Sequence, residues 1–178
     1  MNLVKSRIIS VIGIFILCFI SHFVYNLLPC SLTAIFFPVN ESIWEHMKMI
    51  FTSIILYGII DYIILNKFNI KYNNFFLSLF ITALISIPIY LIIYLPIFYK
   101  IGENIFINIG LMLLVIIITQ VIAYYILKAK ECKLLNYISI VLIIISYIIF
   151  GYLTYNPIKS ELFFDTQDEK YGINNYNV

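Results

Sequence analysis

The chain has 178 residues, of which 63% are hydrophobic and only 11% are charged, and its mean hydropathy is +1.02. Soluble domains carry about 25% charged residues, so this composition predicts a membrane protein with several spanning segments. The formal net charge is +2 and there is no long basic run, which excludes nucleic acid as an expected partner.

The first predicted element begins near Lys5 and Arg7, and its apolar residues imitate a secretory signal. No small-residue cleavage site of the A-x-A type follows it, so we expect a membrane helix rather than a cleaved leader. Four further segments reach the roughly 20 apolar residues that a spanning helix needs. In chain order, the five predicted helices cover residues 7–28, 45–65, 75–98, 104–127 and 134–155.

The predicted fold is therefore all-α, a bundle of about five transmembrane helices in residues 1–155, followed by a polar extracytoplasmic tail in residues 156–178. Pro88 and Pro96 should kink the third helix or end it early. Three glycines are expected where helices pack closely, namely Gly13, Gly58 and Gly110. The tail either folds back over the mouth of the bundle or forms a loosely ordered end.

The distribution of lysine and arginine predicts the orientation in the membrane, because cytoplasmic loops carry an excess of both. With the N-terminus inside, the inner side holds Lys5, Arg7, Lys67, Lys71, Lys128, Lys130 and Lys133. The outer side then holds only Lys48, Lys100, Lys159 and Lys170. We therefore predict a multi-pass protein of the cell membrane with its N-terminus inside and its C-terminus outside.

The segment FPVNESIWEH, residues 37–46, concentrates polar groups at the start of the second predicted helix. Ser42 and Glu45 fit the S/T-x-x-E capping box, and Asn40 is an alternative N-cap. Trp44 falls where the aromatic belt of a membrane protein is expected. A helix entry thus explains much of the segment, but it does not explain His46 or the second carboxylate.

The two histidines of the chain are expected at similar depth on adjacent helices. His22 lies about 9 Å and His46 about 6 Å below the outer end of their helices, from the 1.5 Å rise per residue. Ionisable residues inside a membrane are functional candidates. We predict Glu41 or Glu45 as a catalytic base, and His22, His46 and Glu45 as ligands of a divalent metal such as zinc. A pair of hydrogen-bonded structural histidines is the alternative.

Other polar residues have simpler expected roles. Asp61 is expected to pair with Lys67 or to be capped by water, and Gln120 to form a hydrogen bond between helices. Asn104 and Asn108 either line the same outer pocket as the histidines or cap the fourth predicted helix.

Three stretches, SHFVYNLLP, FFPVNESIWEHMKM and FFDTQDEKYGI, together resemble an uncharacterised group of small bacterial membrane proteins with about five helices. That group shares a histidine in the first helix, a P-x-N-E-S-x-W-E-H box and a C-terminal aspartate followed by Y-G-I. The matching residues are His22, Pro38, Asn40, Glu41, Ser42, Trp44, Glu45, His46, Asp165, Tyr171, Gly172 and Ile173. The resemblance implies that they form a shared site, with structural or recognition roles for Asn40, Ser42, Trp44 and Asp165. It implies no particular chemistry.

Two functional hypotheses follow. In the first, the outer face carries a metal-supported or acid/base site that acts on a lipid, a cell-envelope precursor or a peptide. In the second, the protein is a small permease component or an accessory subunit without catalytic activity. The same groups would then recognise a small solute or only hold helices together.

Overall fold

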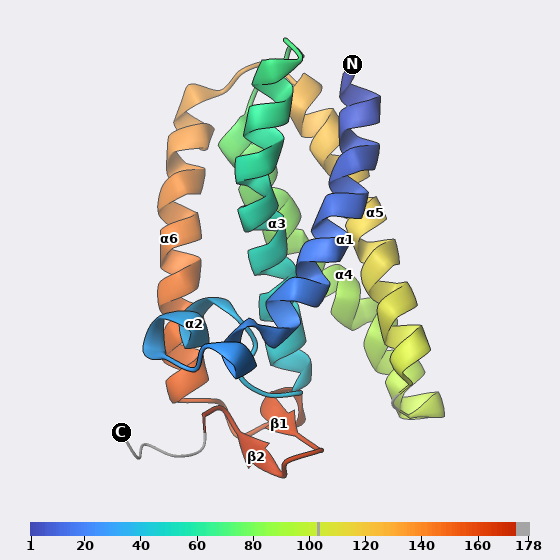
Figure 1. The fold of residues 1–178 in the computed structure, drawn as a ribbon, viewed down its shortest axis with the longest axis vertical. Coiled ribbons are helices and arrows are strands. Elements are labelled where there is room, and N and C mark those ends of the chain that lie inside the picture. The colour runs from blue at the N-terminus through green and yellow to red at the C-terminus, as the bar shows by residue number, and fades with distance from the viewer. Residues whose placement is uncertain (103, 174–178) are drawn as a thin grey trace.

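The computed structural model describes residues 1–102 and 104–173, and this part of the chain forms six α-helices and a small hairpin (Figure 1). The helices are α1 (Leu3–Leu27), α2 (Ser31–Phe36), α3 (Ile43–Lys67), α4 (Phe75–Ile101), α5 (Ile105–Lys128) and α6 (Lys133–Tyr155). All except α2 are long and apolar enough to cross a membrane. Of the predicted tail, residues 174–178 lie outside the described residues.

The five long helices begin and end within a few residues of their predicted limits, because polar caps fix several of their ends. The side chain of Asn2 accepts a hydrogen bond from the amide of Lys5, so α1 begins earlier than predicted. The side chain of Asn104 accepts from the amides of Phe106 and Ile107 at the start of α5. Asn104 is therefore a helix cap.

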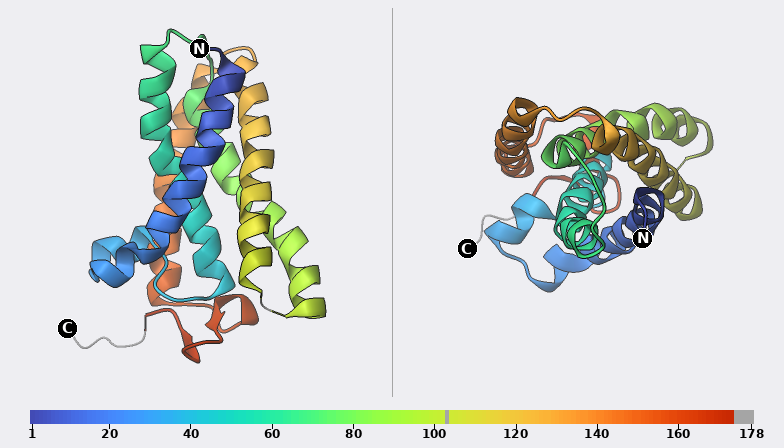
Figure 2. Two further views of the ribbon diagram at one scale, coloured as in Figure 1. Left: turned by 45° about the vertical axis from the view of Figure 1, so that its right-hand side comes forward. Right: turned by 90° about the horizontal axis from the view of Figure 1, so that it is seen from above.

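Successive long helices run in opposite directions, so the N-terminus lies at one end of the bundle and the hairpin at the other (Figure 1). The most buried of them is α3, which packs against α1 and α4. Helix α1 also contacts α5, and α6 lies at the edge against α4 and α2 (Figure 2). The main apolar core joins all five long helices, through residues such as Ile14, Phe51, Ala83, Val115 and Phe150.

Two of the three glycines predicted at close helix contacts are found there. A Cβ on Gly13 would lie 2.1 Å from the ring of Tyr57, and a Cβ on Gly58 would lie 2.6 Å from Leu79. Nothing lies within 4 Å of a Cβ on Gly110, so that prediction is wrong. Helix α4 continues through both of its prolines, which therefore do not end it.

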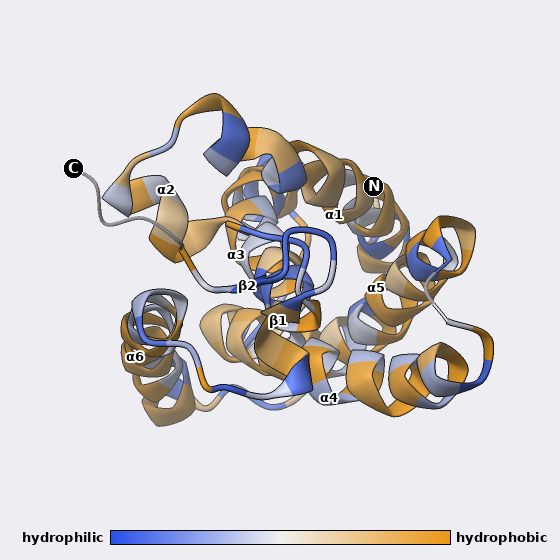
Figure 3. Cartoon of the chain, turned by 90° about the horizontal axis from the view of Figure 1, so that it is seen from below, coloured by the Kyte–Doolittle hydropathy of each residue, from blue (hydrophilic) through white to orange (hydrophobic). Residues whose placement is uncertain are grey.

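The tail folds back under the bundle, which decides between the two alternatives for this segment. It forms a 3-10 turn, η1 (Glu161–Phe163), and two antiparallel strands, β1 (Phe164–Asp165) and β2 (Lys170–Tyr171). Residue Phe164 pairs with Tyr171. Seen from this end, the hydrophilic hairpin lies inside a ring of hydrophobic helices (Figure 3). It covers the place where α3 begins.

Candidate functional site

The polar segment before α3 forms a helix entry, as predicted, with one difference. The hydroxyl of Ser42 accepts from the amide of Glu45 at 3.4 Å, and the side chain of Asn40 accepts from the amide of Ser42 at 3.0 Å. Glu45 does not complete the capping box by returning to Ser42. Its Oε2 instead accepts from the amide of Val39 at 3.1 Å.

Glu45 turns inward because it forms a buried ion pair with Lys48. The ammonium Nζ of Lys48 lies 2.6 Å from Glu45 Oε2. It also donates to the carbonyl of Ala34 in α2 and to the hydroxyl of Thr154 in α6, both at 2.9 Å. Three acceptors thus satisfy the three donors of the ammonium. This network joins α3 to α2 and α6 and occupies the Glu45 carboxylate.

Glu41, rather than Glu45, lies with the two histidines. His22 Nε2 is 3.7 Å from Glu41 Oε1, and His46 Nε2 is 3.5 Å from Glu41 Oε2. One ligand atom from each of the three residues lies within 4.8 Å of the others. The carboxylate that lies with His22 and His46 is therefore that of Glu41, and not that of Glu45 as predicted. The physical reason is that the Glu45 carboxylate forms the buried ion pair with Lys48.

The spacing of these groups suits a metal ion. Both distances exceed the usual 2.7–3.2 Å range of hydrogen bonds, so neither histidine forms a short direct bond to Glu41. Bonds of about 2.1 Å in a tetrahedral zinc site place the ligand atoms about 3.4 Å apart. The side chains of His22, Glu41 and His46 are only 28%, 32% and 25% exposed. A metal ion bound here would be partly shielded from solvent but still accessible to a ligand.

The orientation of the His46 ring is fixed by its other nitrogen. Nδ1 lies 3.0 Å from the carbonyl oxygen of Ser42. A carbonyl can only accept, so Nδ1 carries the proton and Nε2 presents its lone pair to the cluster. Metal-bound histidines are commonly held in this way by a backbone carbonyl. The Ser42 turn therefore both caps α3 and orients a candidate ligand.

The hairpin holds the segment that carries Glu41. Asp165 Oδ2 accepts from the amide of Glu41 at 3.0 Å, while Oδ1 accepts from the amides of Gln167 and Asp168. Asn40 donates from its side-chain amide to the carbonyl of Gly172 at 3.1 Å. Asp165 is 0% exposed. Asp165 and Asn40 thus connect two parts of the chain that are far apart in sequence.

Gly172 and Trp44 also support this contact. Gly172 has a φ of +56°, and a Cβ there would lie 2.5 Å from the carbonyl oxygen of Thr154, so only glycine fits. Trp44 stacks on Phe163 of the tail with 4.8 Å between ring centroids, and it meets Phe150 edge-on. Trp44 therefore packs between the tail and the bundle.

A cavity of about 480 Å³ opens beside the cluster. His22, Glu41 and His46 line it, together with Asn108 of α5 and Gln167 of the hairpin. Asn108 thus lines the same pocket as the histidines, which was one of its two expected positions. Most of the remaining lining is apolar.

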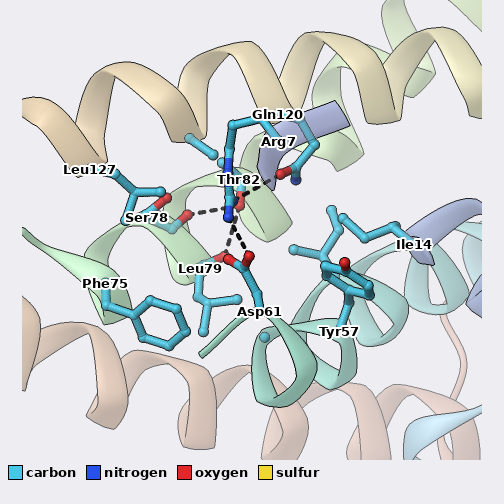
Figure 4. Close-up of a pocket in the computed structure, with 13 residues that line it drawn as sticks. Arg7, Ile14, Tyr57, Asp61, Phe75, Ser78, Leu79, Thr82, Gln120 and Leu127 are labelled. Carbon is cyan, nitrogen blue, oxygen red and sulfur yellow. Dashed lines mark hydrogen bonds and ion pairs between the residues drawn. The ribbon is translucent and has the colours of Figure 1, made fainter. Parts of the chain in front are cut away.

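Figure 4 shows a second polar cluster, formed by residues of α1, α3 and α5, and Arg7 near the start of α1 is one of them. Asp61 pairs with Arg7, not with Lys67 as predicted, and accepts weakly from Ser10 at 3.3 Å. Arg7 also donates to Gln120 at 3.1 Å, which confirms the predicted hydrogen bond between helices. The pocket beside these residues holds only about 20 Å³, roughly the room for one water. This cluster joins α1 to α3 and α5 and is structural.

The buried ion pair of Lys48 was not predicted, although the sequence contains an indication of it. A lysine placed three residues after a glutamate on a helix is within reach of that carboxylate. Its apolar neighbours, from Met47 to Phe51, show that the lysine would be buried.

The comparisons with known proteins add a family but no activity. The model of a family of unknown function, DUF6512, matches residues 1–173. No curated protein and no solved structure matches the chain.

Proposed function

The chain belongs to the DUF6512 family, a family of unknown function, and we propose that it is a membrane protein that binds a divalent metal ion such as zinc through His22, Glu41 and His46. One observation carries this proposal. His22, Glu41 and His46 each offer one ligand atom, and these three atoms lie within 4.8 Å of one another, close enough to bind one ion together after a small adjustment of the side chains. The ligands come from α1, the segment before α3, and α3 itself.

Two histidines and one carboxylate are a ligand set of catalytic zinc sites, which keep a fourth position for water or substrate. An ion held here would polarise a bound water or a substrate oxygen, and so support hydrolysis. The ion would be the electrophile of the site. The protein's own residues orient it: the Ser42 carbonyl sets His46, and Asp165 sets the backbone of Glu41.

The proposed location is the outer face of the cell membrane, with the N-terminus in the cytoplasm. Two findings support it besides the count of lysine and arginine. Five helices suit a bilayer, and the cluster lies at the end of the bundle opposite the N-terminus (Figure 1). Lys48, one of the four positive residues assigned to the outer side, is neutralised in the interior. Arg7, one of the seven assigned to the inner side, is neutralised in the same way by Asp61, so the excess of positive residues on the inner side is kept.

Zinc content tests the proposal. The protein is purified in detergent without a histidine tag, and its zinc is measured by plasma mass spectrometry. We expect near-stoichiometric zinc in the wild type and its loss in His22→Ala, His46→Ala and Glu41→Gln. Glu161→Gln is the matched control, because Glu161 is an exposed carboxylate near the same end of the bundle.

The competing function, a permease component or accessory subunit, predicts a different result. If wild type and variants contain equally little zinc, and do not take it up on titration, the three residues are a structural ion-pair cluster. The metal proposal would then be abandoned.

A further inference from the structure

We propose that the cavity beside His22, Glu41 and His46 binds the hydrocarbon chain of an amphiphile from the outer leaflet, whose oxygen-bearing head group takes the open position on the metal. This inference rests on the proposed metal site for the head group. The chain-binding part rests on the cavity alone.

The polar lining residues of the cavity lie toward its hairpin end, and the deeper lining residues are mostly apolar. On each of three helices, a polar lining residue lies near the hairpin end, and an apolar lining residue follows about one turn, or 5.4 Å, deeper. These pairs are His22 and Cys18 in α1, His46 and Ile50 in α3, and Asn108 and Met112 in α5. The three apolar residues are buried, with exposures of 0%, 1% and 6%.

The cavity is large enough for such a ligand and lacks other charges. Its volume of about 480 Å³ lies within the usual range of small-molecule sites, about 300–1,000 Å³. Among the described residues that line it, no lysine or arginine is present, and Glu41 is the only carboxylate. A strongly charged solute would find no partner beyond the metal. A neutral or singly anionic oxygen group on an apolar chain fits better.

The side of the cavity offers an entrance from the bilayer. The lower ends of α1 and α5 spread apart in both side views (Figures 1 and 2). The lining residues along this seam are apolar and exposed: Phe19 and Phe23 of α1 are 40% and 54% exposed, and Ile105 of α5 is 66% exposed. Gln167 of the hairpin also lines the cavity, on the side away from the bilayer centre. A lipid chain would therefore enter laterally between α1 and α5.

Photolabelling tests the inference on the full chain in phosphatidylcholine nanodiscs. The probe is palmitate with a diazirine on its chain, and labelled peptides are identified by mass spectrometry. We expect label on the cavity-lining parts of α1 and α5. Ile109→Trp should lower this labelling about tenfold, because the indole displaces at least two buried methylene groups. Leu114→Trp is the control, since Leu114 is exposed on α5 away from the cavity.

Competition and zinc measurements separate the possible outcomes. Displacement by oleate but not by acetate supports a ligand with a chain, whereas equal displacement by acetate overturns it. Equal labelling of all lipid-facing helices, unchanged in Ile109→Trp, also overturns it. Zinc is measured on the same samples. If the protein contains zinc but the cavity is not labelled, only the chain-binding inference is wrong. If the cavity is labelled but the protein contains no zinc, only the metal site and its contact with the head group are wrong.

Discussion

At the scale of single residues, two glutamates four positions apart have different surroundings and hence different roles. Glu45 is 2% exposed, and its carboxylate faces the ammonium of Lys48. Glu41 precedes the helix, and its side chain, 32% exposed, faces two imidazoles. Removing one partner of a buried ion pair strands the other charge, whereas removing a half-exposed carboxylate does not. We therefore expect substitution of Glu45 to lower stability and substitution of Glu41 to lower metal binding.

We predict that Glu45→Gln lowers the free energy of unfolding by about 3 kcal/mol, because Lys48 keeps its charge without a counterion. Replacing both residues, as Glu45→Gln with Lys48→Met, should recover part of this loss. Glu41→Gln should abolish zinc binding, and between zinc-free samples it should change stability by less than about 0.5 kcal/mol. Thermal unfolding in detergent, followed by tryptophan fluorescence, measures the stability. Wild-type stability in Glu45→Gln would contradict the structural role of the pair.

At the scale of elements, the hairpin is the part that holds the metal-binding segment. Asp165 accepts three backbone amides, of which one belongs to Glu41. We predict that Asp165→Asn weakens zinc binding by about tenfold or more, as substitutions of residues behind metal ligands do. The long helices should stay folded, as circular dichroism would show. Asp168→Asn, at an exposed carboxylate paired with Lys170, should bind zinc like the wild type. Equal zinc affinity in both variants would mean that the hairpin does not position Glu41.

The elements also show which parts of the structure the sequence can predict. The five long helices follow from apolar length and polar caps, which are local properties. The short helix α2 and the two-residue strands were missed, because contacts with distant segments stabilise them. Contacts with distant segments also decide whether Glu41 or Glu45 lies with the histidines. It depends on Asp165, which is 124 positions from Glu41, and on Thr154, which is 109 positions from Glu45.

At the scale of the whole molecule, an outer-leaflet ligand can reach the proposed site only if that end of the bundle faces outward. The charge argument survives the structure: without the buried pairs of Lys48 and Arg7, three positive residues remain at that end (Lys100, Lys159 and Lys170) and six at the other. The opposite end carries the N-terminus and the loops after α3 and α5 (Figure 1). Reversing the bundle would place the excess of lysine outside, against the usual distribution.

The native cysteines test this orientation without engineered sites. Cys30 is exposed at the same end of the bundle as the proposed site, Cys132 is partly exposed at the opposite end, and Cys18 is buried. Hydrogen bonds that the Cys30 sulfur receives from the side chain and the backbone amide of Thr33 lower the pKa of the Cys30 thiol. A lowered pKa raises the thiolate fraction near neutral pH, and the thiolate is the form that reacts.

A membrane-impermeant maleimide added to intact cells should therefore label Cys30 and miss Cys132, while permeabilised cells should show both. Cys30→Ser should lose the label on intact cells, and Cys132→Ser should keep it. Labelling of Cys132 on intact cells would reverse the orientation and place the His22–Glu41–His46 cluster in the cytoplasm, where an outer-leaflet ligand cannot reach it.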